Sequence, residues 1–258
     1  MSAPYRRASR HDAVWLFIIL GGIAFAIFST SKIPNKDSFG AWLLLIVAIP
    51  IIASIVVAVI VTSLLNRKRV KGIRKALTRR GFRFDAEPDQ VQKDAFFAPL
   101  EHLGSWLGLQ GGATNVQWVA ASDTVGVFEH QYLVGSGKTT QEFLHTVLVF
   151  QDPIGFEYGM TAFRAGYVKK RAILRGQEEF QIGDEAFDKD WVLFGEPAIA
   201  KRFFRHSVQQ LLLDSPKGET WAIGNGYVGV SFEATFNGAN MEKFLDRAKR
   251  VISEASRG

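Results

Sequence analysis

Three groups of residues in this chain have types and spacings that could support chemistry. The first is the run Gly135, Ser136, Gly137, Lys138, whose extended sequence GSGKTT occurs in phosphate-binding loops. A P-loop places its first glycine five residues before the Gly-Lys pair, where this chain has Tyr132, and it continues into a helix. The following QEFLHTVLVF has the residues of a strand. We therefore interpret the run as a hairpin tip that could dock a partner, with nucleotide binding as the less favoured alternative.

The second group is acidic: Asp184, Glu185, Asp188 and Asp190 place four carboxylates within eight residues. Clustered oxygens attract hard cations, so a magnesium-dependent hydrolase or phosphotransfer site is one interpretation. Such sites usually follow a buried strand, but here the apolar WVLF comes after the cluster, and a calcium-loop pattern lacks its glycine and distal glutamate. We favour a solvated acidic turn, with Phe187 and Trp191 in the core.

The third group is a histidine pair. His130 and His145 lie on predicted adjacent strands, and Glu129 could pair with either. Such a pair could bind a metal or act in acid-base chemistry, but a histidine on a strand is more often a packing residue, which we favour. The chain has no cysteine, which excludes thiolate chemistry, and no Gly-x-Ser-x-Gly elbow. We therefore expect no catalytic residue, no metal and no cofactor.

The strands that must position these residues belong to a predicted α+β domain, residues 85–258. Stretches rich in β-branched and aromatic residues predict strands at 115–122, 125–134, 142–151 and 156–161, and their short connections favour an antiparallel meander. A further strand is expected at 191–194. Strands at 219–223 and 227–235 form a hairpin that turns at Asn225-Gly226.

Helices are predicted around this sheet. One covers residues 89–107, and another follows Pro197 with a single apolar stripe formed by Ile199, Phe203, Val208, Leu211 and Leu212. The last begins at Asn240 as a cap and carries a stripe of Met241, Phe244, Leu245, Ala248, Val251 and Ile252.

Before this domain, the chain is apolar. Residues 13–31 and 38–66 contain no charged side chain and are long enough to cross a bilayer core, so we predict a tail over 1–12 and a transmembrane helical hairpin over 13–65. A cleaved signal peptide is the alternative for the first span. Neither span contains an ionisable residue, which argues against a transporter. Small residues at helical spacing could let the spans of several copies form a homo-oligomer.

A basic segment follows, over residues 66–84, and is predicted to be an amphipathic helix that ends near Gly81. Together with the basic tail, it places both termini in the cytoplasm of a multi-pass protein of the bacterial inner membrane. Its cations could bind anionic lipid headgroups or could act only as a topology signal. The residues concerned are Arg67, Lys68, Arg69, Lys71, Arg74, Lys75, Arg79 and Arg80.

Charge is divided unevenly along the chain. Residues 1–83 hold 14 basic and 2 acidic side chains, whereas residues 84–258 hold 17 basic and 23 acidic ones. The predicted domain would therefore repel a polyanion, and we expect no nucleic-acid partner.

The basic segment ends in ALTRRGF, and the domain contains VFEHQYLVGSGK, TVLVF and GDEAFDKDWVLFGEP in that order. A predicted helical hairpin comes before these segments. In this combination, the chain resembles uncharacterised bacterial membrane proteins of unknown function. The resemblance covers most of the chain after about residue 70. The resemblance implies an architecture and a set of shared residues rather than a chemistry. The shared residues are Phe128, Tyr132, Gly137, Lys138, Phe187 and Asp188.

The function expected from these observations is a membrane-anchored, cytoplasmic interaction or regulatory module without catalytic activity, bound to membrane lipids and to an unknown protein partner. One alternative is a membrane-tethered hydrolase or phosphotransfer enzyme that uses the acidic cluster. A second alternative is a domain that senses anionic lipids.

Overall fold

The computed structural model describes residues 38–100, 112–134, 141–151, 160–164, 179–216 and 218–257, with residues 103, 107, 109 and 155 between them. Side chains are described for most of these residues from 52 onward. The chain divides into two compact units, residues 1–71 and 72–258, and each is taken by itself below.

The described part of the first unit is helical. Helix α2 (Ser38–Arg79) is 42 residues long and runs to Lys71 within this unit. It includes the second predicted span, whereas the first predicted span and the tail lie outside the described residues. No helix in the described part of the chain has the length and apolar character that crossing a bilayer requires.

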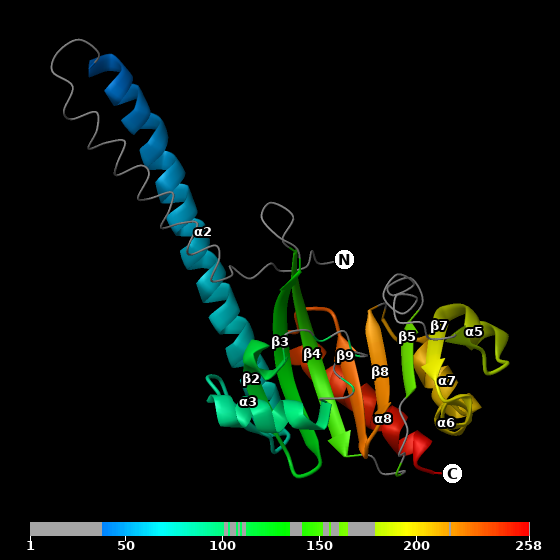
Figure 1. Cartoon of the computed structure of the whole chain (residues 1–258). Helices are drawn as coiled ribbons and strands as arrows, with labels where there is room; N and C mark the ends of the chain where they lie inside the picture. Colours follow the sequence, from blue (N-terminus) through cyan, green and yellow to red (C-terminus); the bar gives the residue numbers. More distant parts are fainter. Residues whose placement is uncertain are drawn as a thin grey trace. The chain divides into compact units, whose positions relative to one another are not determined.

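The second unit is α+β, as predicted, and its described strands form one antiparallel sheet of nine strands in the order β1-β2-β3-β4-β9-β8-β5-β7-β6 (Figure 1). The strands are β1 (Arg83–Asp85), β2 (Val116–Ala121), β3 (Val125–Val134), β4 (Gln141–Gln151), β5 (Met160–Arg164), β6 (Glu179–Phe180), β7 (Trp191–Gly195), β8 (Glu219–Gly224) and β9 (Tyr227–Phe232).

The predicted meander is only partly correct. Strands β2, β3 and β4 are consecutive neighbours, but β4 next pairs with β9, and β5 pairs with β8. The β8–β9 hairpin, from far along the chain, therefore lies between β4 and β5. Its predicted turn is confirmed, since Asn225 and Gly226 both have positive φ, at 53° and 76°.

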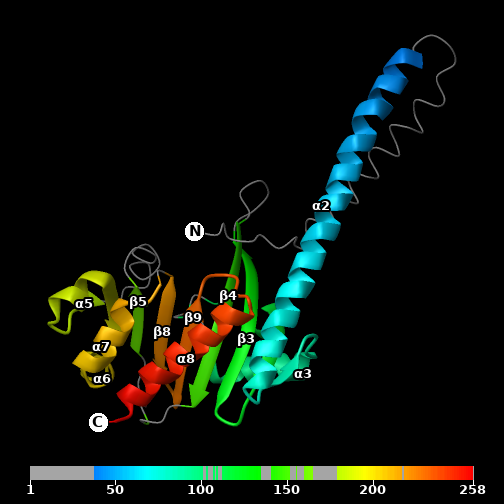
Figure 2. The ribbon, with the colours of Figure 1, turned by 180° about the vertical axis from the view of Figure 1, so that it is seen from behind.

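Helices cover both faces of the sheet. The first group is α3 (Gln90–Phe97) with the 3-10 turns η1 (Ala98–Leu100) and η2 (Gly112–Asn115). The others are α5 (Glu185–Asp190), α6 (Pro197–Phe203), α7 (His206–Leu213) and α8 (Gly238–Ala255). We call the side carrying Phe128 and Val147 the α3 face, and the side carrying Glu219 and Trp221 the α8 face. Figures 1 and 2 show α3 and α8 on opposite sides of the sheet.

On the α8 face, α8 buries the predicted apolar stripe against the sheet. Its cap is Asn237 rather than the predicted Asn240, because the Asn237 side chain accepts a hydrogen bond from the Asn240 N–H at 2.9 Å. The end of α2 also belongs to this unit and buries Ile73 and Leu77. It stops as predicted at Gly81, with φ of 82°.

The α3 face is covered by a short helix and by leucine side chains. Asp89 caps α3 through a reciprocal capping box with Gln92. The predicted helix over 89–107 is wrong in length, because α3 ends at Phe97 and Ala98–Leu100 form a 3-10 turn; Pro99 has no N–H to donate to a continued α-helix. Leucines from the following chain then pack on the sheet against Val119, Phe128 and Val147. These leucines are Leu100, Leu103, Leu107 and Leu109.

The single helix predicted after Pro197 is also wrong. The chain forms α6 and α7 with a break at Phe204, whose φ and ψ are −87° and 58°. Phe204 and Phe203 are both buried, and Phe204 packs on Phe187, which supports the broken backbone through core contacts. Phe187 and Trp191 lie in this core, as predicted.

Candidate functional site

The exposed basic residues of α2 are the first candidates, and they are described for each unit separately. Arg67, Lys68 and Lys71 are exposed on the first unit, and Arg74 and Lys75 are exposed on the second. Among the described residues, no carboxylate forms an ion pair with any of these five side chains. A further residue of the predicted set, Arg69, is hydrogen-bonded to the side-chain oxygen of Asn66 through Nε and Nη2, at 3.1 and 3.0 Å.

The last two cations of the predicted set are held by α8. Arg79 Nη2 lies 2.8 Å from Glu242 Oε1, and Arg80 makes a two-pronged contact with the Asp246 carboxylate. This contact raises the pKa of Arg80 and lowers the pKa of Asp246. Arg79 and Arg80 therefore fasten the end of α2 onto α8 within the second unit.

The acidic cluster is used locally. Asp184 caps α5 by accepting from the Phe187 N–H at 3.0 Å, and Asp188 accepts from the N–H groups of Ile182 and Gly183 at 3.1 and 2.9 Å. The predicted turn is thus a short helix, because these carboxylates satisfy backbone donors at its start. Among the described residues, no three histidine, aspartate or glutamate side chains converge to hold a metal ion.

The histidine pair is brought together as the strands predicted. His130 and His145 are direct partners in the β3–β4 register. Glu129 is buried on the opposite face of β3, since neighbouring strand residues alternate. His130 donates Nε2–H to the Gly112 carbonyl at 3.1 Å and stacks on Phe97, while its buried Nδ1 has no partner among the described residues. Burial lowers the pKa of His130 to about 4, against the opposing effect of the Gly112 bond.

His145 joins two residues that sequence reasoning missed. Its Nδ1 lies 2.9 Å from Ser231 Oγ, and its Nε2 lies 3.4 Å from the Tyr132 hydroxyl. Ser231 could have been found only from the register, since it pairs with Val147 on β4 and so shares the α3 face with His145.

A serine next to a histidine is the arrangement that activates a nucleophile. Here, however, Ser231, His145 and Tyr132 are at most 4% exposed, and the Tyr132 and His145 rings stack with centroids 5.6 Å apart. These groups form a buried polar network that ties β3, β4 and β9 together.

The predicted docking loop, Gly135, Ser136, Gly137 and Lys138, lies outside the described residues. Its flanking strands do form the expected antiparallel pair, with Val134 opposite Gln141.

Comparisons with known proteins supply little. No family model and no curated protein matches the chain. Among solved structures, the chain is similar to the crystal structure of the mycobacterial trehalose monomycolate transport factor A, TtfA, with 13% sequence identity and a TM-score of 0.41. The match covers 75% of this chain and 94% of that one.

Proposed function

We propose that this protein is a membrane-anchored interaction module without catalytic activity of its own, whose α+β unit faces the cytoplasm of a bacterial cell. The observation that carries the proposal is the surface of α2, where exposed apolar side chains are followed directly by exposed cations.

The apolar part needs a cover. Val57, Ile60, Val61, Leu64 and Leu65 are between 47 and 58% exposed, although large aliphatic side chains are normally withdrawn from water. A bilayer would provide that cover, and the sequence contains a second uncharged apolar segment at residues 13–31.

The cationic part suits the cytoplasmic surface of such a bilayer. Arg67, Lys68 and Lys71 follow the apolar part within two helical turns, and Arg74 and Lys75 come next in the sequence. Each cation near an anionic surface contributes roughly 1 kcal/mol. In the proposal, these cations contact the lipid headgroups first. Arg79 and Arg80 belong to the same set, but they also form ion pairs with α8.

The polar groups that could act in catalysis have structural roles, which supports a module without catalytic activity. The carboxylates of Asp184 and Asp188 bind backbone N–H groups, and the Ser231–His145 contact is buried. The alternative enzyme that uses the acidic cluster is therefore less favoured. Lipid sensing by the basic segment stays an alternative, because the same exposed cations would serve it.

The anchor is tested by extracting bacterial membranes that contain the full chain with alkaline carbonate. We expect the protein to stay in the membrane pellet, and an Ile60→Lys, Leu64→Lys variant to move to the wash because two cations make the apolar surface costly to bury. A wild-type protein found in the wash would refute the anchor.

The orientation is tested with a C-terminal tag and protease. In inverted membrane vesicles we expect the tag to be cleaved, and in intact spheroplasts to be protected. Replacing Lys68, Lys71 and Lys75 with glutamate should reduce this asymmetry, because the cytoplasmic excess of cations sets orientation. The matched control replaces the exposed Lys189, Lys201 and Lys243, which lie in the second unit, and should leave the orientation unchanged.

A further inference from the structure

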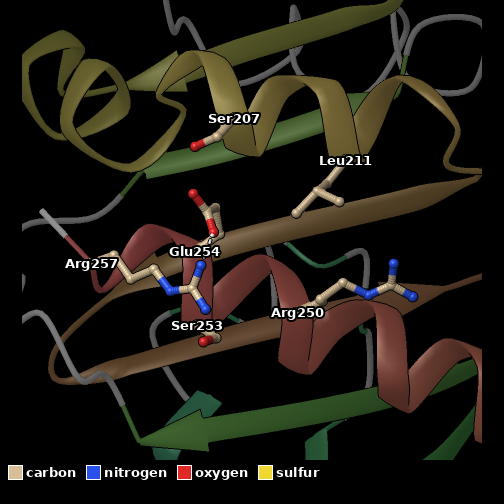
Figure 3. Close-up of a pocket in the computed structure, with 6 residues that line it drawn as sticks. All are labelled: Ser207, Leu211, Arg250, Ser253, Glu254 and Arg257. Carbon is tan, nitrogen blue, oxygen red and sulfur yellow. Dashed lines mark hydrogen bonds and ion pairs between the residues drawn. The ribbon is translucent and has the colours of Figure 1, made fainter.

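A groove lies between α7 and α8 on the second unit, with a volume of about 430 Å³ (Figure 3). Ser207 and Leu211 line it from α7, one helical turn apart. The α8 side is more strongly polar. It is formed by Arg250, Ser253, Glu254 and Arg257.

The charge along this groove is mainly positive. Arg250 is exposed and forms no hydrogen bond or ion pair with a described residue, although it helps to lower the pKa of Asp246, one turn earlier on α8. Arg257 Nη1 lies 3.0 Å from Glu254 Oε2, but the Arg257 side chain remains 71% exposed, so this pair is screened by water.

A third guanidinium lies beside the same end of α8. Arg205 Nη2 donates to the carbonyl oxygens of Glu254 and Ala255, at 2.9 and 2.6 Å. Arg205 also occupies the N-cap of α7 without a side-chain cap, so the first N–H groups of α7 add partial positive charge. The acidic groups nearby are Glu254 and, at the start of α7, Asp184, whose Oδ2 lies 3.5 Å from His206 Nδ1.

We propose that this groove binds an acidic segment of a protein partner in an extended conformation. The proposal rests on the proposed function, and it names the chemical class of the partner. Arg250 lies on α8, and Arg257 lies two residues beyond Ala255, where this helix ends. In an extended peptide, side chains two or four residues apart point to the same face. Two carboxylates with such a spacing can therefore face the groove and its cations together.

The remaining groups of the groove fit the same ligand. The hydroxyls of Ser207 and Ser253 can donate to peptide carbonyls, and Leu211 offers apolar contact to a side chain between the two carboxylates.

The test uses the full chain in a neutral detergent and a displayed library of random twelve-residue peptides. We expect the selected peptides to be enriched in two acidic residues two or four positions apart. One selected peptide is then synthesised with a fluorophore, and its affinity is measured by fluorescence anisotropy at low and high salt. An Arg250→Glu, Arg257→Glu variant should lose at least about tenfold in affinity, and so should the wild type on addition of salt.

The matched control is Lys243→Glu, which reverses an exposed cation on α8 outside the groove lining and should bind as the wild type does. A second variant, Arg250→Ala with Arg257→Ala, should show an intermediate loss. Circular dichroism of each variant confirms that it is folded. Selected peptides without acidic enrichment, or an affinity that the double reversal leaves unchanged, would refute the proposal.

Two further outcomes are distinguished in the same preparations. If phosphatidylglycerol vesicles bind the wild type in a way that Arg250→Glu, Arg257→Glu abolishes, and no acidic peptide binds, the groove serves lipid and the proposal is wrong. Carbonate extraction is repeated on the groove variants, which should stay in the membrane pellet. A failure of peptide binding with the anchor intact rejects the groove alone, whereas a wild type in the wash rejects the anchor.

Discussion

On the α8 face, an 18-residue helix and the end of α2 cover the sheet, whereas on the α3 face the described cover is the short helix α3, the turns η1 and η2, and leucine side chains. The α8 face is held by charged groups in defined pairs, including buried Glu219 with Arg247. The α3 face is held by leucines and by neutral polar groups such as His130 and Ser231. One face of the sheet is thus covered by helices that are held by ion pairs. The other face is covered mainly by apolar side chains that can change rotamer.

This difference predicts where the unit tolerates change. A helix fixed by backbone contact and buried charge has no alternative arrangement of similar energy, while leucine side chains can adopt other rotamers. Substitutions should therefore cost more on the α8 face, unless they introduce a charge under α3. The following experiments measure the free energy of unfolding of the full chain in detergent, by urea and tryptophan fluorescence.

The largest effect is expected from Arg247→Met. Glu219 is fully buried and accepts hydrogen bonds from Ser215, Trp221 and Arg247, so removal of the cation leaves an uncompensated carboxylate. We expect a loss of about 4 kcal/mol. Adding Glu219→Gln to the variant should recover part of it, because the buried charge is gone. A loss below about 1 kcal/mol would show that this face does not depend on the pair.

Lowering the pH should reduce the free energy of unfolding mainly through His130, on the α3 face. In the unfolded chain its pKa is near 6.5, and in the folded chain it is about 4, so the unfolded state takes up the proton first. The stability that neutral His130 contributes is complete above pH 6.5 and falls as the pH drops to 4. Relative to His130→Gln, the wild type should lose about 3 kcal/mol over this range.

The control for this experiment is His206→Gln, since the His206 side chain is 79% exposed. It removes a histidine from α7 rather than from the sheet, so it controls for the substitution itself. Glu233, whose pKa burial raises to about 7, makes stability fall as the pH rises from 4.5 to 7, but it is present in every variant and cancels in the difference. Identical pH profiles for the wild type and His130→Gln would contradict the burial of a neutral imidazole.

A smaller effect is expected where α2 crosses α8. A Cβ on Gly238 would lie 2.6 Å from the Gly72 carbonyl oxygen, and a backbone atom cannot move aside by a rotamer change. Gly238→Ala should cost about 2 kcal/mol. Gly72→Ala is the matched control, because its Cβ would meet Gly238 N at an ordinary 3.7 Å, and it should be neutral or stabilising.

The smallest effect is expected at Gly229, on the α3 face. A Cβ there would lie 2.6 Å from Leu107 Cδ1, but this atom is the end of a flexible side chain. We expect Gly229→Ala to cost about 1 kcal/mol, and Leu107→Val in the same chain to reduce that cost. A larger loss at Gly229 than at Gly238 would reverse the comparison between the two faces.

Local signals explain what could be predicted from the sequence. Gly81 ends α2, and Asn225-Gly226 turns the β8–β9 hairpin, because each requires a backbone conformation that few residues adopt. The apolar stripe of α8 has the period of a helix packed on one side. The register of His130 with His145 likewise follows from two adjacent strands.

Nonlocal packing explains what could not. Nothing near β4 or β5 in the chain indicates that the β8–β9 hairpin lies between them. The break at Phe204 contains neither glycine nor proline and depends on aromatic contacts with α5. Ser231 meets His145 only through the β4–β9 pairing, and the groove requires α7 and α8 to lie side by side.

The position of the β8–β9 hairpin also constrains the order of folding during synthesis. When β5 is synthesised, its partner β8 is still more than fifty residues further along the chain, and β4 lacks β9. The nascent chain therefore presents two unpaired strand edges until its last quarter emerges. Chains truncated before residue 219 should keep those edges exposed and aggregate, and chaperones that bind extended apolar segments should associate with them most strongly in this interval.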